Sequence, residues 1–350
     1  MRMIGDVKIG PVGLGAMPLS IEGRPDEARA VATIHAAVEA GVTLIDTADS
    51  YHWHAGEAGH NERLIARALS AYGGAEVLVA TKGGRGRPGD GSWTVNGDPR
   101  HLRGACEASL RRLGVEAIGL YQLHKPDPAV PFADSVGALR DLLDEGKIRM
   151  AGISNVGADQ IREAAGVLGG RLASAQNRFS PAVREAADTL AVCADLGVAF
   201  LPWSPLGGIS LSALDTLDGT PLTTRGTLDG APPSTRDTLD GAPPSTRDTL
   251  DGAPPSTRDT LDGTPLTTRD TLDGAPAHTP RRPFQVFHEI AAERGVSPQR
   301  VCLAWHLALG PHVIPIPGAT RPATIRDSAA AGALTLTADE LARLDLSPGA

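Results

Sequence analysis

VGLGAMPLSIEGRP, residues 12–25, distinguishes the two α/β folds that this 350-residue chain could adopt. A doubly wound dinucleotide-binding sheet carries the pattern GxGxxG between its first strand and its first helix. Gly13 and Gly15 fit the pattern, but Pro18 stands where the third glycine should be. The segment PLSIEGRP also separates the strand from the next helical pattern, whereas the fingerprint leads directly into a helix. This segment therefore favours the other common α/β fold, a (β/α)8 TIM barrel.

The rest of the chain alternates between short apolar runs and amphipathic helical stretches. DEARAVATIHAAVEAG, residues 26–41, follows Pro25 with acidic residues, repeats Ala30, Ile34 and Val38 at a spacing of four, and ends at a glycine. Several apolar runs are hydrophobic at consecutive positions, which is typical of strands covered on both faces. Eight runs predict the barrel strands: Val12–Met17, Val42–Asp46, Val77–Thr81, Ile118–Leu123, Met150–Ile153, Ser174–Arg178, Val198–Trp203 and Val313–Ile316.

Composition and charge exclude several classes of function. Hydrophobic residues make up 41% of the chain, which is enough for a sizeable core. The net charge of −8 argues against a nucleic-acid partner, because phosphate backbones are bound by clustered Lys and Arg. The first residues lack the apolar core of a signal peptide, and we find no uninterrupted apolar run of about twenty residues that would span a membrane.

Cysteine and histidine spacing gives no sign of a metal site or a disulfide framework. Three cysteines stand apart from each other, without a CxxC pattern: Cys106, Cys193 and Cys302. Isolated cysteines suit a reducing compartment, so we expect a cytoplasmic protein. Three histidines lie close together but lack the spacing of known zinc motifs: His52, His54 and His60. We therefore expect no metal.

An internal repeat interrupts the alternation after the seventh predicted strand. The unit TLDGxPxxTRx begins at Thr216 and recurs every 11 residues, with a Gly, a Pro and only one or two Leu in every unit. So little apolar surface cannot offset the entropy of ordering, and the Gly and Pro exclude a long helix. We predict a disordered low-complexity insertion over residues 211–283 in a single barrel domain of residues 1–350. A passenger expansion, a partner-binding tether and an ordered structure remain open.

Four ionisable residues follow the second, third and fourth predicted strands: Asp46, Tyr51, Lys82 and His124. Because barrel chemistry sits at the carboxyl ends of the strands, we expect these side chains to meet at one rim. Each alone has an ordinary explanation, as a helix cap, a solvated charge or a structural histidine. Together they form a proton-handling group, in which Lys82 would lower the pKa of the Tyr51 hydroxyl and Asp46 would hold the ammonium in place.

The same segments resemble the aldo-keto reductase superfamily over all of the chain except the repeat. The matching motifs, in the family's order, are LIDTADSY, VATKGG, LYQLHKPDP, LLDEGKIRMAGISN, AQNRFS, WSPLGG and IPIPGATRP. The resemblance implies a barrel closed by an N-terminal hairpin, for which VKIGPVGLGAM, residues 7–17, is suitable. It also implies NADPH-dependent reduction of a small carbonyl substrate, with Tyr51 as general acid, Lys82 and Asp46 as its tuning pair and His124 orienting the carbonyl.

The resemblance also implies the cofactor-binding residues: Ser154, Asn155, Gln176, Trp203, Ser204, Pro205, Leu206, Gly318, Thr320, Arg321, Asp327 and Ser328. Arg321 would hold the adenosine 2′-phosphate at a helix start. The chain departs from many relatives at Thr324, where they carry a second Arg, and at the pair Asp327-Ser328, where theirs is Glu-Asn. We therefore expect NADPH, with NADH as an open possibility.

Trp53, His54 and the loop around Trp93 are expected to line the substrate mouth. We expect a monomer or a weak oligomer. The alternative function is a cofactor-sensing regulatory subunit on the same barrel, and the intact group of four residues argues against it.

Overall fold

The computed structural model describes residues 2–207, 209 and 284–345. The predicted insertion at residues 211–283 therefore lies outside the described residues. The described residues on either side of it belong to one compact unit.

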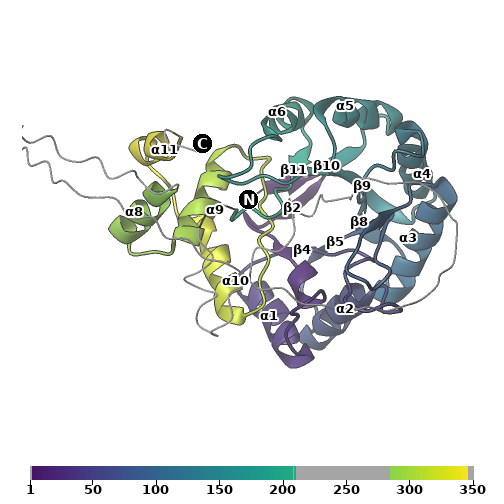
Figure 1. The fold of residues 1–350 in the computed structure, drawn as a ribbon, viewed down its shortest axis with the longest axis horizontal. Coiled ribbons are helices and arrows are strands. Elements are labelled where there is room, and N and C mark those ends of the chain that lie inside the picture. Colours follow the sequence, from purple (N-terminus) through teal and green to yellow (C-terminus); the bar gives the residue numbers. More distant parts are fainter. Residues whose placement is uncertain (1, 208, 210–283, 346–350) are drawn as a thin grey trace, which may run out of the picture. The chain divides into compact units, whose positions relative to one another are not determined.

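The centre of this unit is a parallel sheet surrounded by helices (Figure 1). In the described residues its strands are ordered β3-β4-β5-β8-β9-β10-β11. Their bounds are β3 Leu14–Gly15, β4 Leu44–Asp46, β5 Leu78–Gly83, β8 Ile118–Leu123, β9 Ile148–Ser154, β10 Leu172–Gln176 and β11 Ala199–Phe200. This parallel α/β sheet is consistent with the predicted TIM barrel.

Residues 312–318, which contain the eighth predicted strand, lie between the two edge strands of this sheet. On one side the Ile314 amide donates to the Phe200 carbonyl of β11 at 2.9 Å. On the other side the Gly13 and Gly15 amides donate to the carbonyls of Pro315 and Pro317, at 3.0 and 2.9 Å. A proline lacks an N–H and can only accept on that side, so the segment forms isolated bridges rather than a regular strand.

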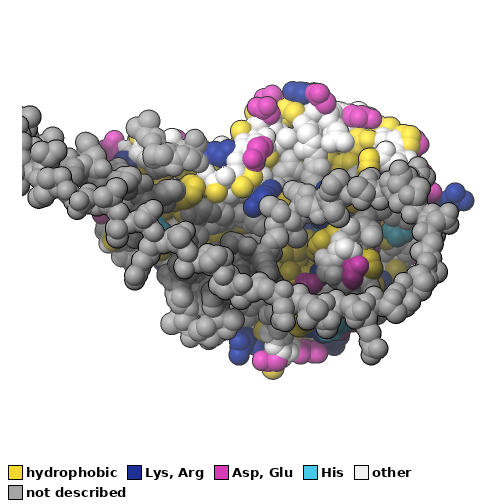
Figure 2. Space-filling view, viewed as in Figure 1, with side chains coloured by type: hydrophobic (Ala, Val, Ile, Leu, Met, Phe, Trp, Pro, Cys, Tyr) yellow, Lys and Arg dark blue, Asp and Glu magenta, His cyan; other side chains and the backbone are white. Residues whose placement is uncertain are grey.

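The helices follow the strands along the chain. Their bounds are α1 Glu27–Glu39, α2 His60–Tyr72, α3 Pro99–Leu113, α4 Phe132–Asp144, α5 Ala158–Val167, α6 Ala187–Leu196, α8 Gln285–Arg294, α9 Pro298–Ala308, α10 Pro322–Ala329 and α11 Ala338–Asp345, with short 3-10 turns at Met17–Leu19 and Ala330–Ala333. Helix α1 begins where its sequence predicts, because the Asp26 side chain accepts from the Arg29 amide at 2.8 Å. Acidic and basic side chains are interspersed on the outer side of α5 and α6 (Figure 2). None of the described helices is both long and apolar enough to span a bilayer.

The N-terminal hairpin begins earlier in the chain than the segment we assigned to it. Strand β1, Arg2–Ile4, pairs antiparallel with β2, Val7–Ile9, across a two-residue turn in which Gly5 has a positive φ of 55°. Residues 14 and 15 of the predicted segment instead form β3, because their partner is β4 of the parallel sheet.

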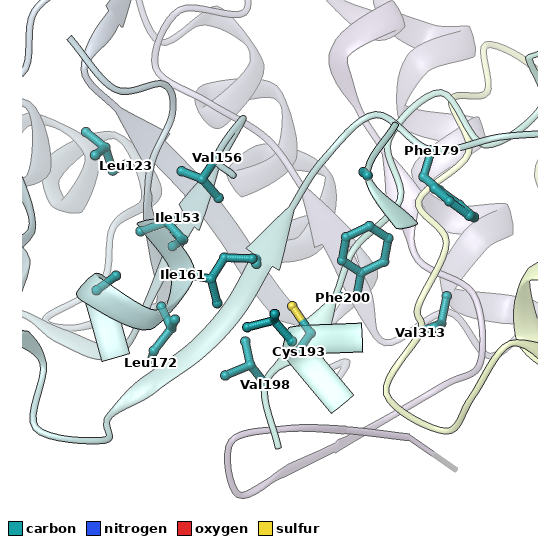
Figure 3. Close-up of a cluster of buried hydrophobic side chains, with 14 of the residues drawn as sticks. Leu123, Ile153, Val156, Ile161, Leu172, Phe179, Cys193, Val198, Phe200 and Val313 are labelled. Carbon is teal, nitrogen blue, oxygen red and sulfur yellow. The ribbon is translucent and has the colours of Figure 1, made fainter. Parts of the chain in front are cut away.

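Two apolar layers hold the unit together. Side chains alternate along each strand, so Leu120 of β8 belongs to the cluster inside the sheet, whereas its neighbour Tyr121 belongs to the cluster under the helices. Figure 3 shows part of the outer cluster, where Ile153, Ile161 and Phe200 lie between the sheet and the helices. The polar site residues lie next to the inner cluster, on the same face of the strands.

Candidate active site

The polar side chains of the site lie two residues further along each strand than residues of the inner apolar cluster. Leu44 and Ala80 belong to that cluster, and two residues further on are Asp46 and Lys82. A spacing of two keeps a side chain on the same face of a strand. Strand polarity therefore puts these groups together at the carboxyl ends of the strands, where TIM-barrel enzymes carry their chemistry.

The ammonium of Lys82 is at the centre of the site. It donates to Asp46 Oδ1 at 2.6 Å, to the Thr47 carbonyl at 2.8 Å and to the Tyr51 hydroxyl oxygen at 3.1 Å. An ammonium has three N–H groups and no acceptor, so these three bonds occupy all of them. The Tyr51 oxygen accepts from Lys82, and its own proton therefore points elsewhere.

The charged pair is almost completely enclosed, with Lys82 1% and Asp46 3% exposed. Burial lowers the pKa of Lys82, but the charge of Asp46 and the contact with Tyr51 outweigh burial and raise that pKa above its ordinary value. The second oxygen of Asp46 accepts from Gln176 Nε2 at 2.8 Å and from Gln122 Nε2 at 3.4 Å. Lys82 is thus charged at neutral pH, and the hydrogen bonds hold the pair in one geometry.

Lys82 acts on the pKa of Tyr51 in the expected direction, but the net shift of that pKa is upward. Burial of the hydroxyl raises the pKa of Tyr51 above its ordinary value, and the nearby Lys82 lowers it by less. The charge of Asp46 also opposes ionisation of Tyr51. Sequence alone could show that the cation was near, but the cost of removing water from the phenol depends on the whole surrounding fold.

His124 stands edge-on to Tyr51, with ring centroids 5.6 Å apart and an interplanar angle of 82°. Its Nδ1 lies 3.4 Å from the Ser50 hydroxyl. Burial, with the charges of Lys82 and Arg85 adding to it, lowers the pKa of His124 well below its ordinary value. The ring is therefore neutral at physiological pH and can donate one N–H to an oxygen.

Asp49, in the loop between Asp46 and Tyr51, is half-buried, with its Oδ1 enclosed near a second carboxylate. Its Oδ1 finds no hydrogen-bond partner in the described residues. Burial and the nearby Glu62 raise the pKa of Asp49 to about 8. Glu62 itself is held by Thr81 at 2.6 Å and by Arg112 at 2.5 Å. Asp49 is consequently protonated at neutral pH.

This protonated carboxyl predicts a pH-dependent stability. The folded protein keeps a proton on Asp49 up to pH ~8, whereas the unfolded chain releases it above pH ~4. The contribution of Asp49 to stability is therefore complete below pH ~4 and is lost as the pH rises to ~8.

In Asp49→Asn, whose amide does not ionise, the free energy of unfolding should fall less between pH 5 and pH 9. Urea unfolding at both pH values measures the difference. Asp159→Asn, at an exposed position, serves as the control and should keep the wild-type slope, and an Asp49→Asn slope equal to it would contradict the prediction.

The predicted nicotinamide-binding residues of β9 and β10 form one connected network. Ser154 Oγ donates to the Gln176 carbonyl at 2.9 Å, and Asn155 Nδ2 donates to Ser154 Oγ at 3.1 Å and to the His124 carbonyl at 2.9 Å. Through the bond from Gln176 to Asp46, this network joins the ionisable group described above. The backbone of Asn155 has a positive φ of 59°, a strained conformation that often marks functional sites.

The segment after β11 contains another strained residue. Trp203 is half-buried against the inner apolar cluster, and its backbone amide donates to the Asn177 carbonyl at 3.0 Å. The next residue, Ser204, is exposed and has a positive φ of 48°. Pro205 is buried and Leu206 is half-buried. Two of the three non-glycine residues with positive φ in the described chain thus fall among the predicted cofactor residues.

The remaining predicted cofactor residues follow the eighth segment. Gly318 forms a bridge with Gly15 of β3, Thr320 is half-buried, and Arg321 is the N-cap residue of α10. Asp327 on α10 makes an ion pair with Arg300 at 2.5 Å and accepts from Ser297 at 2.5 Å, so its carboxylate joins α10 to the start of α9. Ser328 is buried.

Sequence reasoning missed two buried polar residues of the site. Gln122 contacts Asp46, and Ser174 donates to Gln122 Oε1 at 3.2 Å. A Cβ on Gly152, between them, would collide with both side chains. The signal was present, since Gln122 occupies an inward position of an otherwise apolar strand.

The structure brings together some of the residues that were expected to line the substrate mouth. Trp93 lies edge-on to His124, with ring centroids 6.4 Å apart. Trp53 stacks on His54 at 4.9 Å. His52 Nδ1 lies 2.9 Å from the His54 carbonyl, and His60 Nδ1 lies 2.8 Å from Ser20 Oγ. No cluster of three or more His, Cys, Asp or Glu side chains suited to a metal ion occurs in the part of the chain that the structure describes.

Comparison with known proteins agrees with the resemblance seen in the sequence motifs. The model of the Aldo/keto reductase family matches residues 11–347. An uncharacterized oxidoreductase of Schizosaccharomyces pombe is 37% identical over 218 residues, which are 61% of this chain and 68% of that protein. The structure of a glycerol dehydrogenase from Gluconobacter oxydans is similar with a TM-score of 0.68 and 27% identity, over 99% of this chain and 93% of the other. A Bombyx mori aldo-keto reductase solved with NADP has a TM-score of 0.65 and 20% identity, over 99% and 91% of the two chains, and supports the fold.

Proposed function

The chain belongs to the aldo/keto reductase family and is an NAD(P)H-dependent oxidoreductase, and we propose that it reduces an aldehyde or ketone with NADPH, using Tyr51 as the proton donor. The observation that carries the proposal is the contact between Lys82 and Tyr51. Because Lys82 Nζ donates to the Tyr51 oxygen at 3.1 Å, the Tyr51 proton is directed away from the ion pair and is available to a substrate oxygen.

Lys82 favours loss of this proton at the moment of reaction. As the Tyr51 O–H bond breaks, negative charge develops on an oxygen that already accepts from an ammonium. Such a preorganised charge stabilises the transition state more than the ground state. Asp46 keeps the ammonium in position and charged, with the two partners 2.6 Å apart. The raised pKa of Tyr51 keeps the hydroxyl protonated until substrate arrives.

His124 orients the carbonyl. In the tautomer in which Nδ1 accepts from the Ser50 hydroxyl, 3.4 Å away, the imidazole carries its proton on Nε2, which can donate to the same oxygen that Tyr51 protonates. Two donors to one oxygen define the plane of the carbonyl group. Its lowered pKa keeps His124 neutral, so Tyr51 remains the proton source.

A dinucleotide fits the residues that are present. Ser154, Asn155 and Gln176, which hydrogen bonds connect, have hydroxyl and amide groups that fit a carboxamide beside Asp46, and Arg321 at the start of α10 carries a cation that fits a phosphate. The half-buried Trp203 offers an aromatic face to the nicotinamide ring. When bound, the reduced nicotinamide supplies the hydride.

Arg321 is expected to distinguish the two nicotinamide cofactors. A charge-assisted hydrogen bond to a phosphate contributes about 1.5–3 kcal/mol, so Arg321→Ala should weaken NADPH binding by at least about tenfold and leave NADH binding nearly unchanged. Titration of cofactor fluorescence measures both dissociation constants. Arg326→Ala is the matched control, because Arg326 lies on the same helix and pairs with Glu39 at 2.9 Å. An equal loss for both cofactors in Arg321→Ala would show that Arg321 does not bind the 2′-phosphate.

Purified protein mixed with NADPH and a nitrobenzaldehyde tests the proposed reaction. We expect loss of NADPH absorbance that depends on the aldehyde and on enzyme concentration. Binding of NADPH without turnover of any aldehyde or ketone in a broad panel would overturn the proposed function. The same panel run with NADH determines the cofactor preference in the reaction.

A further inference from the structure

A tryptophan and two arginines lie beside the proposed reaction site, on a short hairpin that follows β5. In this hairpin β6, Arg85–Gly86, pairs antiparallel with β7, Thr94–Val95. The ring of Trp93 meets the ring of His124, and the face of the same indole is covered by guanidinium groups. The hairpin thus connects basic side chains to the residue proposed to orient the carbonyl.

The first of the two guanidinium groups fastens the hairpin to the barrel. Arg87 lies 4.6 Å from the centroid of Trp93 and is buried. It forms an ion pair with Glu22, and its Nη1 donates to the His52 carbonyl at 2.7 Å. Arg87 therefore positions Trp93.

Arg85 is the guanidinium whose charge reaches the reacting groups. Its Cζ lies 4.4 Å from the centroid of Trp93, and its side chain is half-buried. Its charge lowers the pKa of His124. The same charge also acts to lower the pKa of Tyr51, against the rise that burial causes. Contact with an aromatic face restricts the long side chain, so less entropy is lost when the guanidinium binds a ligand.

We propose that Arg85, held against Trp93, selects carbonyl substrates that also carry a carboxylate. A planar guanidinium presents two parallel N–H groups that match the two oxygens of a carboxylate, and a site partly closed to water strengthens that bond. With the carbonyl oxygen at Tyr51 and His124, the carboxylate of the same molecule extends to Arg85 along Trp93. This inference rests on the proposed function and adds the substrate class to it.

The test compares 4-carboxybenzaldehyde with its neutral methyl ester. Wild-type protein with NADPH should show a kcat/KM at least about tenfold higher for the acid than for the ester, and this preference should decline as salt is added. In Arg85→Gln the acid-to-ester ratio of kcat/KM should fall by about tenfold or more; because the charge of Arg85 also reaches His124 and Tyr51, the ratio is the readout rather than the rate for either compound alone. Arg85→Lys should keep part of the preference, since it keeps the charge but loses the paired N–H groups.

Arg24→Gln is the matched control. Arg24 also lies over a tryptophan, 6.0 Å from the centroid of Trp53, and pairs with Glu57, so its loss should leave the acid-to-ester ratio unchanged. Thermal melting checks that each variant is folded. Calorimetric binding of 4-(hydroxymethyl)benzoate, the alcohol product, to wild type and Arg85→Gln gives a readout that does not depend on turnover.

The outcomes separate this inference from the function on which it rests. Reduction of the ester with no preference for the acid, or an acid-to-ester ratio that is the same in folded Arg85→Gln, overturns the role of Arg85 and leaves the proposed function standing. Failure of wild type to reduce either compound counts against the proposed function. In that case the calorimetric binding of 4-(hydroxymethyl)benzoate decides the carboxylate site. Weaker binding to Arg85→Gln than to wild type still supports the site, and equal binding overturns it.

Discussion

Replacing Tyr51 with Phe should reduce kcat about a thousandfold while leaving the protein folded. The change removes one hydroxyl oxygen, which donates the proposed proton and accepts from Lys82 at 3.1 Å. General acid catalysis contributes typically 10²–10⁴-fold, and the loss falls on kcat because the proton moves only in the transition state. Steady-state kinetics with NADPH and a nitrobenzaldehyde measure it.

Two controls show that the loss in Tyr51→Phe is chemical. Cofactor binding should be close to that of wild type, since the predicted cofactor residues lie on β9, β10 and the segments after β11. Tyr72→Phe, which removes a hydroxyl from an exposed tyrosine on α2, should have full activity. A Tyr51→Phe protein that turns over like wild type would eliminate Tyr51 as the acid.

Replacing Lys82 with Met should remove activity and also destabilise the fold. Asp46 would remain in the interior without its cation, and breaking a buried ion pair by removing one partner typically costs about 3–5 kcal/mol. The bond from Gln176 to Asp46 remains, which places the expected loss nearer the lower value. Urea unfolding at pH 7 measures the change in the free energy of unfolding.

The double variant Asp46→Asn/Lys82→Met separates stability from activity. With both charges removed, no uncompensated charge is buried, so most of the lost stability should return. Activity should stay absent, because no ammonium faces the Tyr51 oxygen. A double variant as unstable as Lys82→Met would show that the destabilisation comes from packing rather than from the unpaired carboxylate.

Local patterns predicted the frame of the fold well. Apolar runs predicted the strands of the parallel sheet, and the structure places β4, β5 and β8 within or next to the predicted ranges. The hairpin was placed too late, because the short strands β1 and β2 carry little pattern and their pairing depends on a two-residue turn at Gly5. The sequence predicts a strand at Val313–Ile316, and the structure gives this segment isolated bridges because Pro315 and Pro317 have no N–H to donate.

The sequence by itself determined which side chains meet at the carboxyl ends of the strands. A strand has a period of two, and parallel strands end at one edge, so Asp46 and Lys82 could be placed beside each other without coordinates. Only the tertiary structure decided how those groups behave. Burial raises the pKa of Tyr51 despite Lys82 and raises the pKa of Asp49 to about 8, and both effects depend on water excluded by residues distant in sequence. The position of Arg85 over Trp93, next to His124, is likewise a product of the folded hairpin, because no local pattern joins residues of a loop to the end of another strand.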